Sequence, residues 1–240
     1  MPDLAGEKTL GYQTARTDFS KVETLRLDAA YRLAHLPLVA PGHPDVISSA
    51  DGKPYRMGKR PEAFSVVIPI DGAALASSPG YVAMENALQQ SSFADEIDWA
   101  LLPRRQHVLH ATIAGGMSAD PIAPVLSQFR SFEAELRGLF SGNINLGRLY
   151  LRLYPETREC GNAITEIQHA LGKPATALYL AGLFNLNDHL PQAKTQELAE
   201  LIDRFWSCLL VKFRVDTLWL LGTSDDLALE SRIVERIALR

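Results

Sequence analysis

The chain has 240 residues, of which 47% are hydrophobic and 22% are charged, so it carries enough apolar side chains for one sizeable core and is not a disordered polypeptide. Its 28 acidic and 24 basic residues give a formal charge of −4, which excludes a global positive field of the kind that holds a protein on duplex DNA or an anionic membrane. Two cysteines, Cys160 and Cys208, are too few for a disulfide scaffold, and they favour a reducing compartment.

The N-terminal region predicts a helix followed by a loop. Residues 17–36 have the capping-box spacing of Ser20 and Glu23 and apolar residues at helical intervals, whereas residues 37–61 are rich in proline and glycine. No apolar stretch has the length of a signal peptide or of a membrane span. We therefore expect a soluble, cytoplasmic protein with an extension over residues 1–54 and a domain over residues 55–240.

The next segment predicts an alternation of strands and helices. A β-branched apolar run at 64–71 predicts a buried strand, and Ser78-Pro79 predicts the start of a helix that reaches about residue 90. Residues 97–102 and 107–114 are two further strand candidates, joined by a basic turn. A helix is predicted from Asp120-Pro121 to about residue 139 on the spacing of Val125, Phe129, Phe132, Leu136 and Leu139.

The C-terminal half continues the alternation. Strict alternation predicts a strand at 148–154, with Arg148, Tyr150, Arg152 and Tyr154 on one face and three leucines on the other. A helix at 157–171, a strand at 175–186, a helix from Pro191 and strands at 213–222 and 232–239 follow, although the last segment also fits a short helix. Helices placed between strands indicate a mixed sheet in an α/β or α+β fold.

The most informative residues for function are His110 and Thr112. Residues two apart on a strand project from the same face, so the imidazole and the hydroxyl would lie side by side. An imidazole exchanges a proton near neutral pH, and a hydroxyl can donate a hydrogen bond to a phosphate oxygen, without any metal. The alternative is a hydrogen-bonded strand histidine with no catalytic role.

Residues 101–116, LLPRRQHVLHATIAGG, resemble the first signature of the two-histidine (2H) phosphoesterase superfamily, the 2′-5′ RNA ligase-like proteins. The resemblance covers roughly residues 55–240 and implies a bilobal, pseudo-symmetric α+β fold with mixed or antiparallel sheets flanked by helices. It also implies a cleft that takes one His-x-Thr/Ser motif from each lobe and acts on phosphodiesters or cyclic phosphodiesters of RNA ends and nucleotides. One histidine would be the general base and the other the general acid, with no cofactor and no metal.

The second motif departs from the pattern of the family. Residues 110–115 align with residues 177–182, which puts Ala177 where a histidine is expected and Tyr179 at the position of the hydroxyl. Tyr179 could anchor a phosphate oxygen, but a phenol with a pKa near 10 is a slow acid. We find no clear substitute among the other histidines: His107 would need a bulge to turn it towards His110, and His35, His43, His169 and His189 lie elsewhere in the predicted order.

The polar face of 148–154 is the other candidate surface. Arg148 and Arg152 offer guanidinium groups to phosphate oxygens, and Tyr150 and Tyr154 offer rings on which bases stack; an exposed sheet face with a structural role is the alternative. The sequence thus predicts a 2H-type protein that acts on an RNA end or a small nucleotide, with a non-catalytic pseudoenzyme that binds the same ligand as the alternative. An interaction scaffold built on residues 17–36 is a third interpretation.

Overall fold

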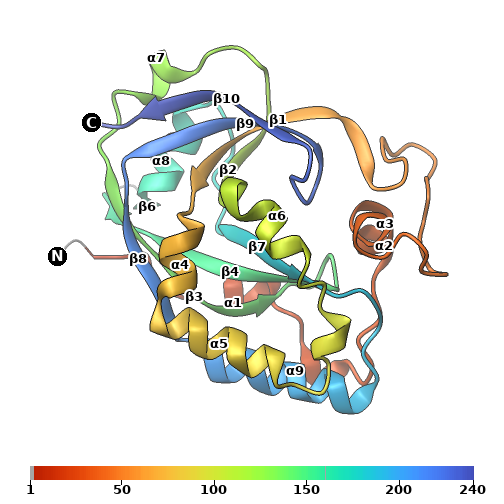
Figure 1. Ribbon diagram of the computed structural model, residues 1–240. Helices are drawn as coiled ribbons and strands as arrows, with labels where there is room; N and C mark the ends of the chain where they lie inside the picture. Colours follow the sequence, from red (N-terminus) through yellow and green to blue (C-terminus); the bar gives the residue numbers. More distant parts are fainter. Residues whose placement is uncertain (1–2, 160) are drawn as a thin grey trace.

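Two antiparallel sheets form the centre of the computed structural model, which describes residues 3–159 and 161–240 (Figure 1). Each sheet has four strands, and helices flank both. The α+β class expected from the sequence is confirmed. Every pairing between neighbouring strands is antiparallel, so of the mixed or antiparallel sheets expected the antiparallel arrangement is the one formed, and the prediction of a mixed sheet is wrong. Cys160, one of the two cysteines, lies outside the described residues.

Sheet 1 has the strand order β10-β9-β1-β2, so the first strand of the chain, β1, pairs with β9, one of the last two. Its strands are β1 (Lys59–Pro69), β2 (His110–Met117), β9 (Thr217–Asp225) and β10 (Ser231–Ala238). One face packs into the main core through Val66, Ile68 and Leu220, all fully buried. The opposite face carries Ser65, Thr112 and Leu221, and this face forms the candidate site described below.

Sheet 2 has the strand order β7-β4-β3-β8. Its strands are β3 (Phe132–Ser141), β4 (Arg148–Pro155), β7 (Leu180–Asn185) and β8 (Leu209–Val215), with a short separate hairpin of β5 (Thr157–Arg158) and β6 (Gly161–Asn162). The strands β3 and β4 are central and almost wholly buried. Edge strands β2 and β7 of the two sheets lie against each other.

Helices flank the two sheets. They are α1 (Tyr12–Ala15), α2 (Ala29–Ala34), α3 (Leu36–Val39), α4 (Gly72–Ser77), α5 (Pro79–Gln89), α6 (Leu101–Arg105), α7 (Ala123–Leu126), α8 (Ala163–Ala170) and α9 (Gln192–Phe205), with the 3₁₀ turns η1 (Phe19–Lys21), η2 (Ala94–Glu96) and η3 (Gln106–Val108). In Figure 1, α5 and α9 lie side by side below the sheets. The described residues contain no helix that is long and apolar enough to span a membrane.

The predicted helix at 120–139 is wrong. Only Ala123–Leu126 is helical, and Phe132–Ser141 is the central strand β3, paired with β4 on one side and β8 on the other. A strand that is buried on both faces shows no alternation of apolar and polar residues, so its apolar residues also satisfied a helical spacing. The predicted strand at 97–102 is also wrong. Ile97 forms a single isolated bridge with Leu186, and the helix α6 begins at Leu101, because a short apolar run fits a helix as well as a strand.

The predicted helix at 17–36 is also wrong in most of its length. Asp18, not Ser20, caps the 3₁₀ turn η1, and Leu25 forms an extended bridge with Leu190 before α2 begins. Several other bounds shift: α8 begins at Ala163, β7 begins at Leu180, and residues 213–222 divide between β8 and β9. The last segment is a strand, β10.

The N-terminal segment packs closely against sheet 2. Tyr12, Leu25 and Tyr31 are fully buried and belong to the same core as the strands. The hydroxyl of Tyr12 donates to the carbonyl of Leu153, and the hydroxyl of Tyr31 donates to the carbonyl of Leu186. Residues before position 54 therefore help to form the core and, as described below, the candidate site.

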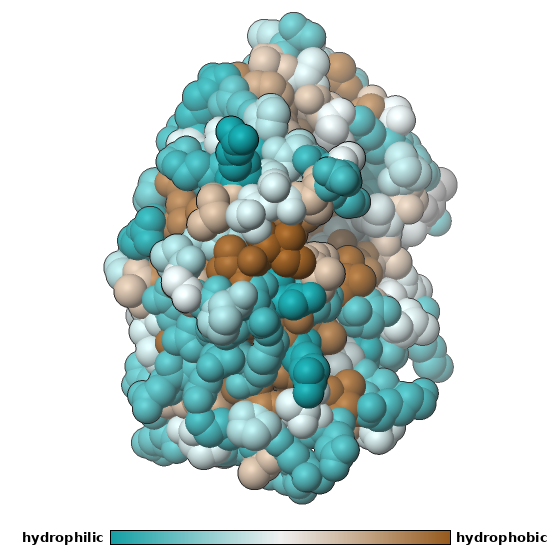
Figure 2. Space-filling model, turned by 90° about the vertical axis from the view of Figure 1, so that its right-hand side faces the viewer, coloured by the Kyte–Doolittle hydropathy of each residue, from teal (hydrophilic) through white to brown (hydrophobic). Residues whose placement is uncertain are grey.

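Apolar side chains also reach the surface on one side of the molecule. Figure 2 shows them gathered across the middle of the face that lies on the right in Figure 1, with polar residues above and below.

Candidate functional site

A polar cavity of about 240 Å³ lies on the face of sheet 1 that carries His110 and Thr112. Sheet 1 contributes these two side chains together with Ser65. Other walls include His35, just after α2, and Arg148, the first residue of β4. The lining is completed by Arg60, Asn145, Leu221, Thr223, Asp225, Asp226 and Ala228. The side-by-side arrangement of His110 and Thr112 that the sequence predicts is confirmed, and both side chains line one cavity.

His110 has the hydrogen-bonding pattern of a base. Its Nδ1 lies 2.6 Å from the carbonyl oxygen of Val108, and since a carbonyl only accepts, Nδ1 carries the proton. In the neutral ring Nε2 therefore keeps its lone pair. Burial lowers the pKa of His110 to about 4, with help from the nearby guanidinium groups of Arg105 and Arg148 and against the opposing effect of the hydrogen bond to Val108. At neutral pH the imidazole is therefore uncharged, and the lone pair of Nε2 can accept a hydrogen bond.

Arg148 brings a positive charge to the cavity without a carboxylate partner among the described residues. Its Nη1 donates to Nε2 of His35 at 2.9 Å and to the carbonyl oxygen of Asp226 at 2.8 Å, while its buried Nε has no partner among the described residues. The guanidinium lies directly over Gly182, where a Cβ would be only 2.2 Å from Nη2 and 2.3 Å from Nε. The absence of a side chain at Gly182 therefore makes room for the charged group.

Arg105 adds a second buried guanidinium group near His110. Its Nη2 donates to the carbonyl oxygen of Gly182 at 2.9 Å, and it forms no ion pair within the described part of the chain. Burial, assisted by the charge of Arg148, lowers the pKa of Arg105 to about 9, although Asp225 opposes the shift. Arg105 does not line the cavity, but its charge adds to that of Arg148, and neither guanidinium has a carboxylate partner among the described residues, so the charge near His110 favours an anion.

The two carboxylates at the cavity are already engaged. Asp226 accepts from Arg60 Nε at 3.0 Å and from the hydroxyl of Tyr55, and Asp225 accepts the backbone N–H groups of Leu227, Leu229 and Glu230. These bonds shape the turn between β9 and β10. Because both side chains are used in this way, neither is free to serve as an acid next to His110.

Tyr179 and Ala177, the residues expected at the second motif, do not face His110. Tyr179 is fully buried, and its hydroxyl donates to the carbonyl oxygen of Thr176 at 2.6 Å. Ala177 lies against the position of Gly11, whose Cβ would be 3.6 Å away. The role expected for Tyr179 as a phosphate anchor therefore has no support in the geometry of the cavity.

The exposed polar face expected on residues 148–154 is not formed. Arg152 is fully buried: its Nη1 donates to Oε1 of Glu7 at 2.9 Å and to the hydroxyl of Tyr154, and its guanidinium stacks 3.6 Å from the ring of Trp206. Tyr154 is also fully buried. Tyr150 lies under Arg148 at 5.4 Å but does not line the cavity, so Arg148 alone of these four residues reaches it.

Among the described residues, one imidazole besides that of His110 reaches the cavity, and it belongs to His35. His35 is buried and stacks on Tyr31 with ring centroids 5.1 Å apart. His107 lies in η3 and lines a different hollow, and His189 is bonded to Asp45. No local pattern in the sequence indicates His35, because it lies 75 residues before His110 and reaches the cavity through the packing of α2.

The low pKa of His110 predicts a dependence of stability on pH. An unfolded histidine has a pKa near 6.5. As the pH falls from about 6.5 to about 4, position 110 is therefore protonated in the unfolded chain but stays neutral in the folded protein. We expect the free energy of unfolding to fall by up to about 3 kcal/mol from this residue, and burial acts in the same direction on His35. Urea unfolding at several pH values should show a shallower fall in a His110→Asn variant; equal slopes in both proteins would contradict the prediction.

Comparison with known proteins gives a similarity in fold alone. No protein-family model matches the chain, and no curated protein sequence matches it. Among solved structures, the crystal structure of TT0787 of Thermus thermophilus is similar, with a TM-score of 0.41 and 13% sequence identity. The match covers 74% of this chain and 98% of that chain. A similarity of this degree says nothing about the chemistry of the cavity.

Proposed function

We propose that the cavity binds a phosphodiester of a nucleotide or an RNA end, and that His110 acts on this ligand as a base without a metal ion. The observation that carries the proposal is that His110 and Thr112 share one cavity with Arg148, a guanidinium with no carboxylate partner among the described residues. One guanidinium group can donate two parallel hydrogen bonds to two oxygens of a phosphate group. The hydroxyls of Thr112 and Ser65 can donate to the other phosphate oxygens.

The charges around the cavity favour a monoanion. Arg60 and Arg148 line the cavity together with Asp225 and Asp226, and Arg105 does not line it but is close enough for its charge to lower the pKa of His110. Both His35 and His110 have lowered pKa values that keep them neutral. Three positive charges and two negative ones leave a single positive charge. A linear or cyclic phosphodiester carries one negative charge and would balance it, whereas a phosphate monoester carries nearly two at neutral pH.

The groups at the cavity can supply one of the two proton transfers of a displacement at phosphorus. Nε2 of His110 can take the proton of the attacking oxygen, whether water or a ribose hydroxyl. Arg148 can stabilise the charge that develops on the phosphate oxygens, but a guanidinium does not release its proton at neutral pH. In the 2H pattern that His110 and Thr112 resemble, a second imidazole serves the leaving group. Here solvent would have to do so, which lowers the rate by a factor of about 10²–10⁴.

A non-catalytic binding protein is the second candidate, and the state of His35 favours it. The second imidazole at the cavity is committed to Arg148, since its Nε2 accepts the hydrogen bond from Nη1. In this arrangement His35 holds Arg148 in place and has no proton to give from that nitrogen. The same cavity would then recognise a nucleotide or RNA end without turning it over.

Activity in the presence of EDTA separates the two candidates. We expect slow cleavage of 2′,3′-cyclic nucleotides or short 2′-5′-linked oligonucleotides, and a loss of at least about 100-fold in a His110→Ala variant. His169→Ala, which changes an exposed histidine of α8, serves as the matched control and should keep the wild-type rate. Equal traces of cleavage in the wild type and His110→Ala would reject His110 as the base. Tight binding of the ligand with no cleavage would favour the non-catalytic candidate.

A further inference from the structure

Arg105, the last residue of α6, is a buried cation with unused hydrogen-bond donors. Its guanidinium donates to two carbonyl oxygens of β7, those of Gly182 and Leu183, at 2.9 and 3.3 Å. A guanidinium has five N–H groups, so three of them, including the buried Nε–H, have no partner among residues 3–159 and 161–240. A buried charge without a counter-charge is destabilising, and a bound anion would relieve this.

Arg105 lines a hollow of about 240 Å³, called the Arg105 hollow, which shares no lining residue with the phosphodiester cavity. Ala76 and Gln106 are exposed and also line it, so the hollow is open to solvent. Its volume is below the range of about 300–1,000 Å³ that is typical of pockets for drug-sized ligands, which indicates a small ligand. Most of its other walls are apolar, and they include Leu75, Leu102, Leu109 and Leu183.

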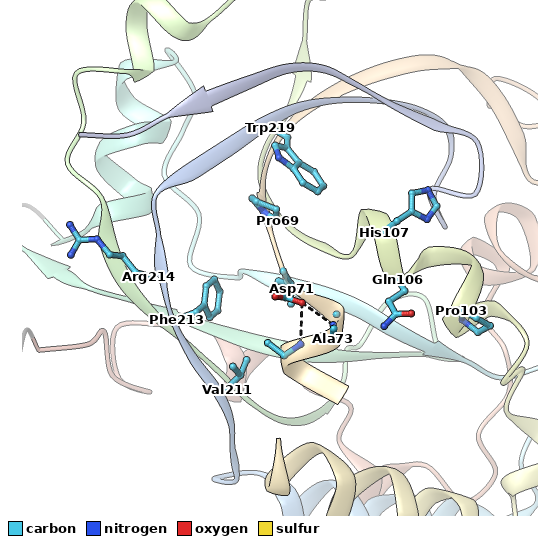
Figure 3. A pocket seen from close by; sticks show the side chains of 13 residues that line it. Pro69, Asp71, Ala73, Pro103, Gln106, His107, Val211, Phe213, Arg214 and Trp219 are labelled. Atoms are coloured by element: carbon cyan, nitrogen blue, oxygen red, sulfur yellow. Dashed lines mark hydrogen bonds between the residues drawn. The ribbon is translucent and has the colours of Figure 1, made fainter. Parts of the chain in front are cut away.

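A wider hollow of about 670 Å³ adjoins the Arg105 hollow, and Gly72, Pro103 and Gln106 line both (Figure 3). None of the described residues that line the wider hollow is a buried charged side chain. Its charged or titratable residues are all exposed, and they are Asp71, His107 and Arg214. The buried and unpaired charge therefore distinguishes the Arg105 hollow from its larger neighbour as a site for an anion.

The chemistry of the Arg105 hollow suits a compact monocarboxylate. A planar guanidinium can donate two parallel hydrogen bonds to a carboxylate, and the leucine walls can cover an apolar body. Glu85 of α5 also lines the hollow, but it is partly exposed and accepts the hydroxyl of Tyr81 at 2.9 Å. Solvent therefore screens its charge, and its carboxylate disfavours a second acidic group on the ligand.

We propose that the Arg105 hollow binds a small carboxylate with a compact apolar body. The proposal does not rest on the function proposed for the phosphodiester cavity, because the two sites have separate walls. The charge of Arg105 nevertheless acts on His110, so a bound carboxylate would reduce the positive charge near the phosphodiester cavity.

Calorimetric titration with benzoate tests the proposal. Benzoate has both the charge and an apolar ring, benzamide has nearly the same shape without the charge, and acetate has the charge without the ring. We expect benzoate to bind about 10-fold more tightly than benzamide, and acetate to bind at least about 10-fold more weakly than benzoate. Arg105→Met keeps a long apolar side chain in place, and it should weaken benzoate binding by about 10- to 100-fold and remove the advantage over benzamide.

Two further variants keep the test decisive if Arg105→Met fails to fold. Ala76 is exposed, and Ala76→Phe should fill the hollow and abolish benzoate binding. Ala83→Phe, at an exposed position of α5 outside both hollows, is the matched control and should keep the wild-type affinity. The proposal is overturned if the wild type does not bind benzoate, or if binding persists in both Arg105→Met and Ala76→Phe. It is also overturned if Arg148→Ala alone abolishes binding, because the anion would then lie in the phosphodiester cavity.

Discussion

Replacing Gly182 with alanine is expected to weaken phosphodiester binding by about 10- to 100-fold, close to the effect of Arg148→Ala itself, because a hydrogen bond to a charged group contributes about 1.5–3 kcal/mol. The guanidinium of Arg148 occupies the space of the missing side chain, where a Cβ would be 2.2–2.5 Å from three of its atoms. The added methyl group must push the guanidinium away from its bonds with His35 and Asp226. Titration with a 2′,3′-cyclic nucleotide measures the loss.

The fold should survive this substitution. The atoms in conflict belong to the far end of a flexible side chain, and Gly182 does not have the positive φ that would make alanine strained there. The chain offers a matched control in Gly115→Ala on β2, where the nearest atom to the new Cβ would be Ser65 Oγ at an ordinary 3.7 Å. We expect wild-type affinity in that control. Wild-type affinity in Gly182→Ala would mean that the contact of the Arg148 guanidinium with Gly182 does not position Arg148 for the ligand.

Elements with an unambiguous period were predictable from the sequence. The alternation of arginine, leucine and tyrosine gave β4 within one residue, and the Ser78-Pro79 signal placed α5 correctly, since Ser78 caps it. The strand β3 could not be recognised in this way because it lies between two other strands and is buried on both faces. Its apolar residues carry no information about period, and tertiary pairing decided its conformation.

One part of the candidate site could be predicted from the sequence and the other could not. His110 and Thr112 are two residues apart on one strand, and this local relation was visible in the sequence. Arg148 was also singled out, but for a surface that does not exist. Its bond to His35 joins residues 113 positions apart, and its seat depends on Gly182 of a neighbouring strand. Such relations arise only from the packing of α2 and β7 around β4, which no spacing along the chain reveals.

Arg152→Ala is expected to lower stability and not the affinity of the folded protein for its ligand. The side chain of Arg152 is fully inaccessible, pairs with Glu7, and stacks on Trp206, whose carbonyl oxygen it also bonds. Truncation would leave the Glu7 carboxylate without its cation and the Trp206 carbonyl without this donor, and it would open a cavity in the core. Removing a fully buried side chain together with these bonds costs about 3–5 kcal/mol, and the melting temperature should fall by roughly 10 °C in a chain of this size.

A comparison of Arg148 and Arg152 tests whether β4 places the first arginine at the cavity and the second in the core. Arg104→Ala, at an exposed position of α6, removes the same charge and should leave the melting temperature unchanged, since exposed charges contribute little to stability. Arg148→Ala should reduce ligand affinity with a far smaller effect on melting than Arg152→Ala, because Arg148 lies at the cavity and is repelled by Arg105. If Arg152→Ala instead melts like the wild type and loses the ligand, then residues 148–154 form the continuous binding face that their alternation suggested. The burial of Arg152 beneath Trp206 predicts the opposite, because a guanidinium cannot support the core and contact a ligand in solvent at the same time.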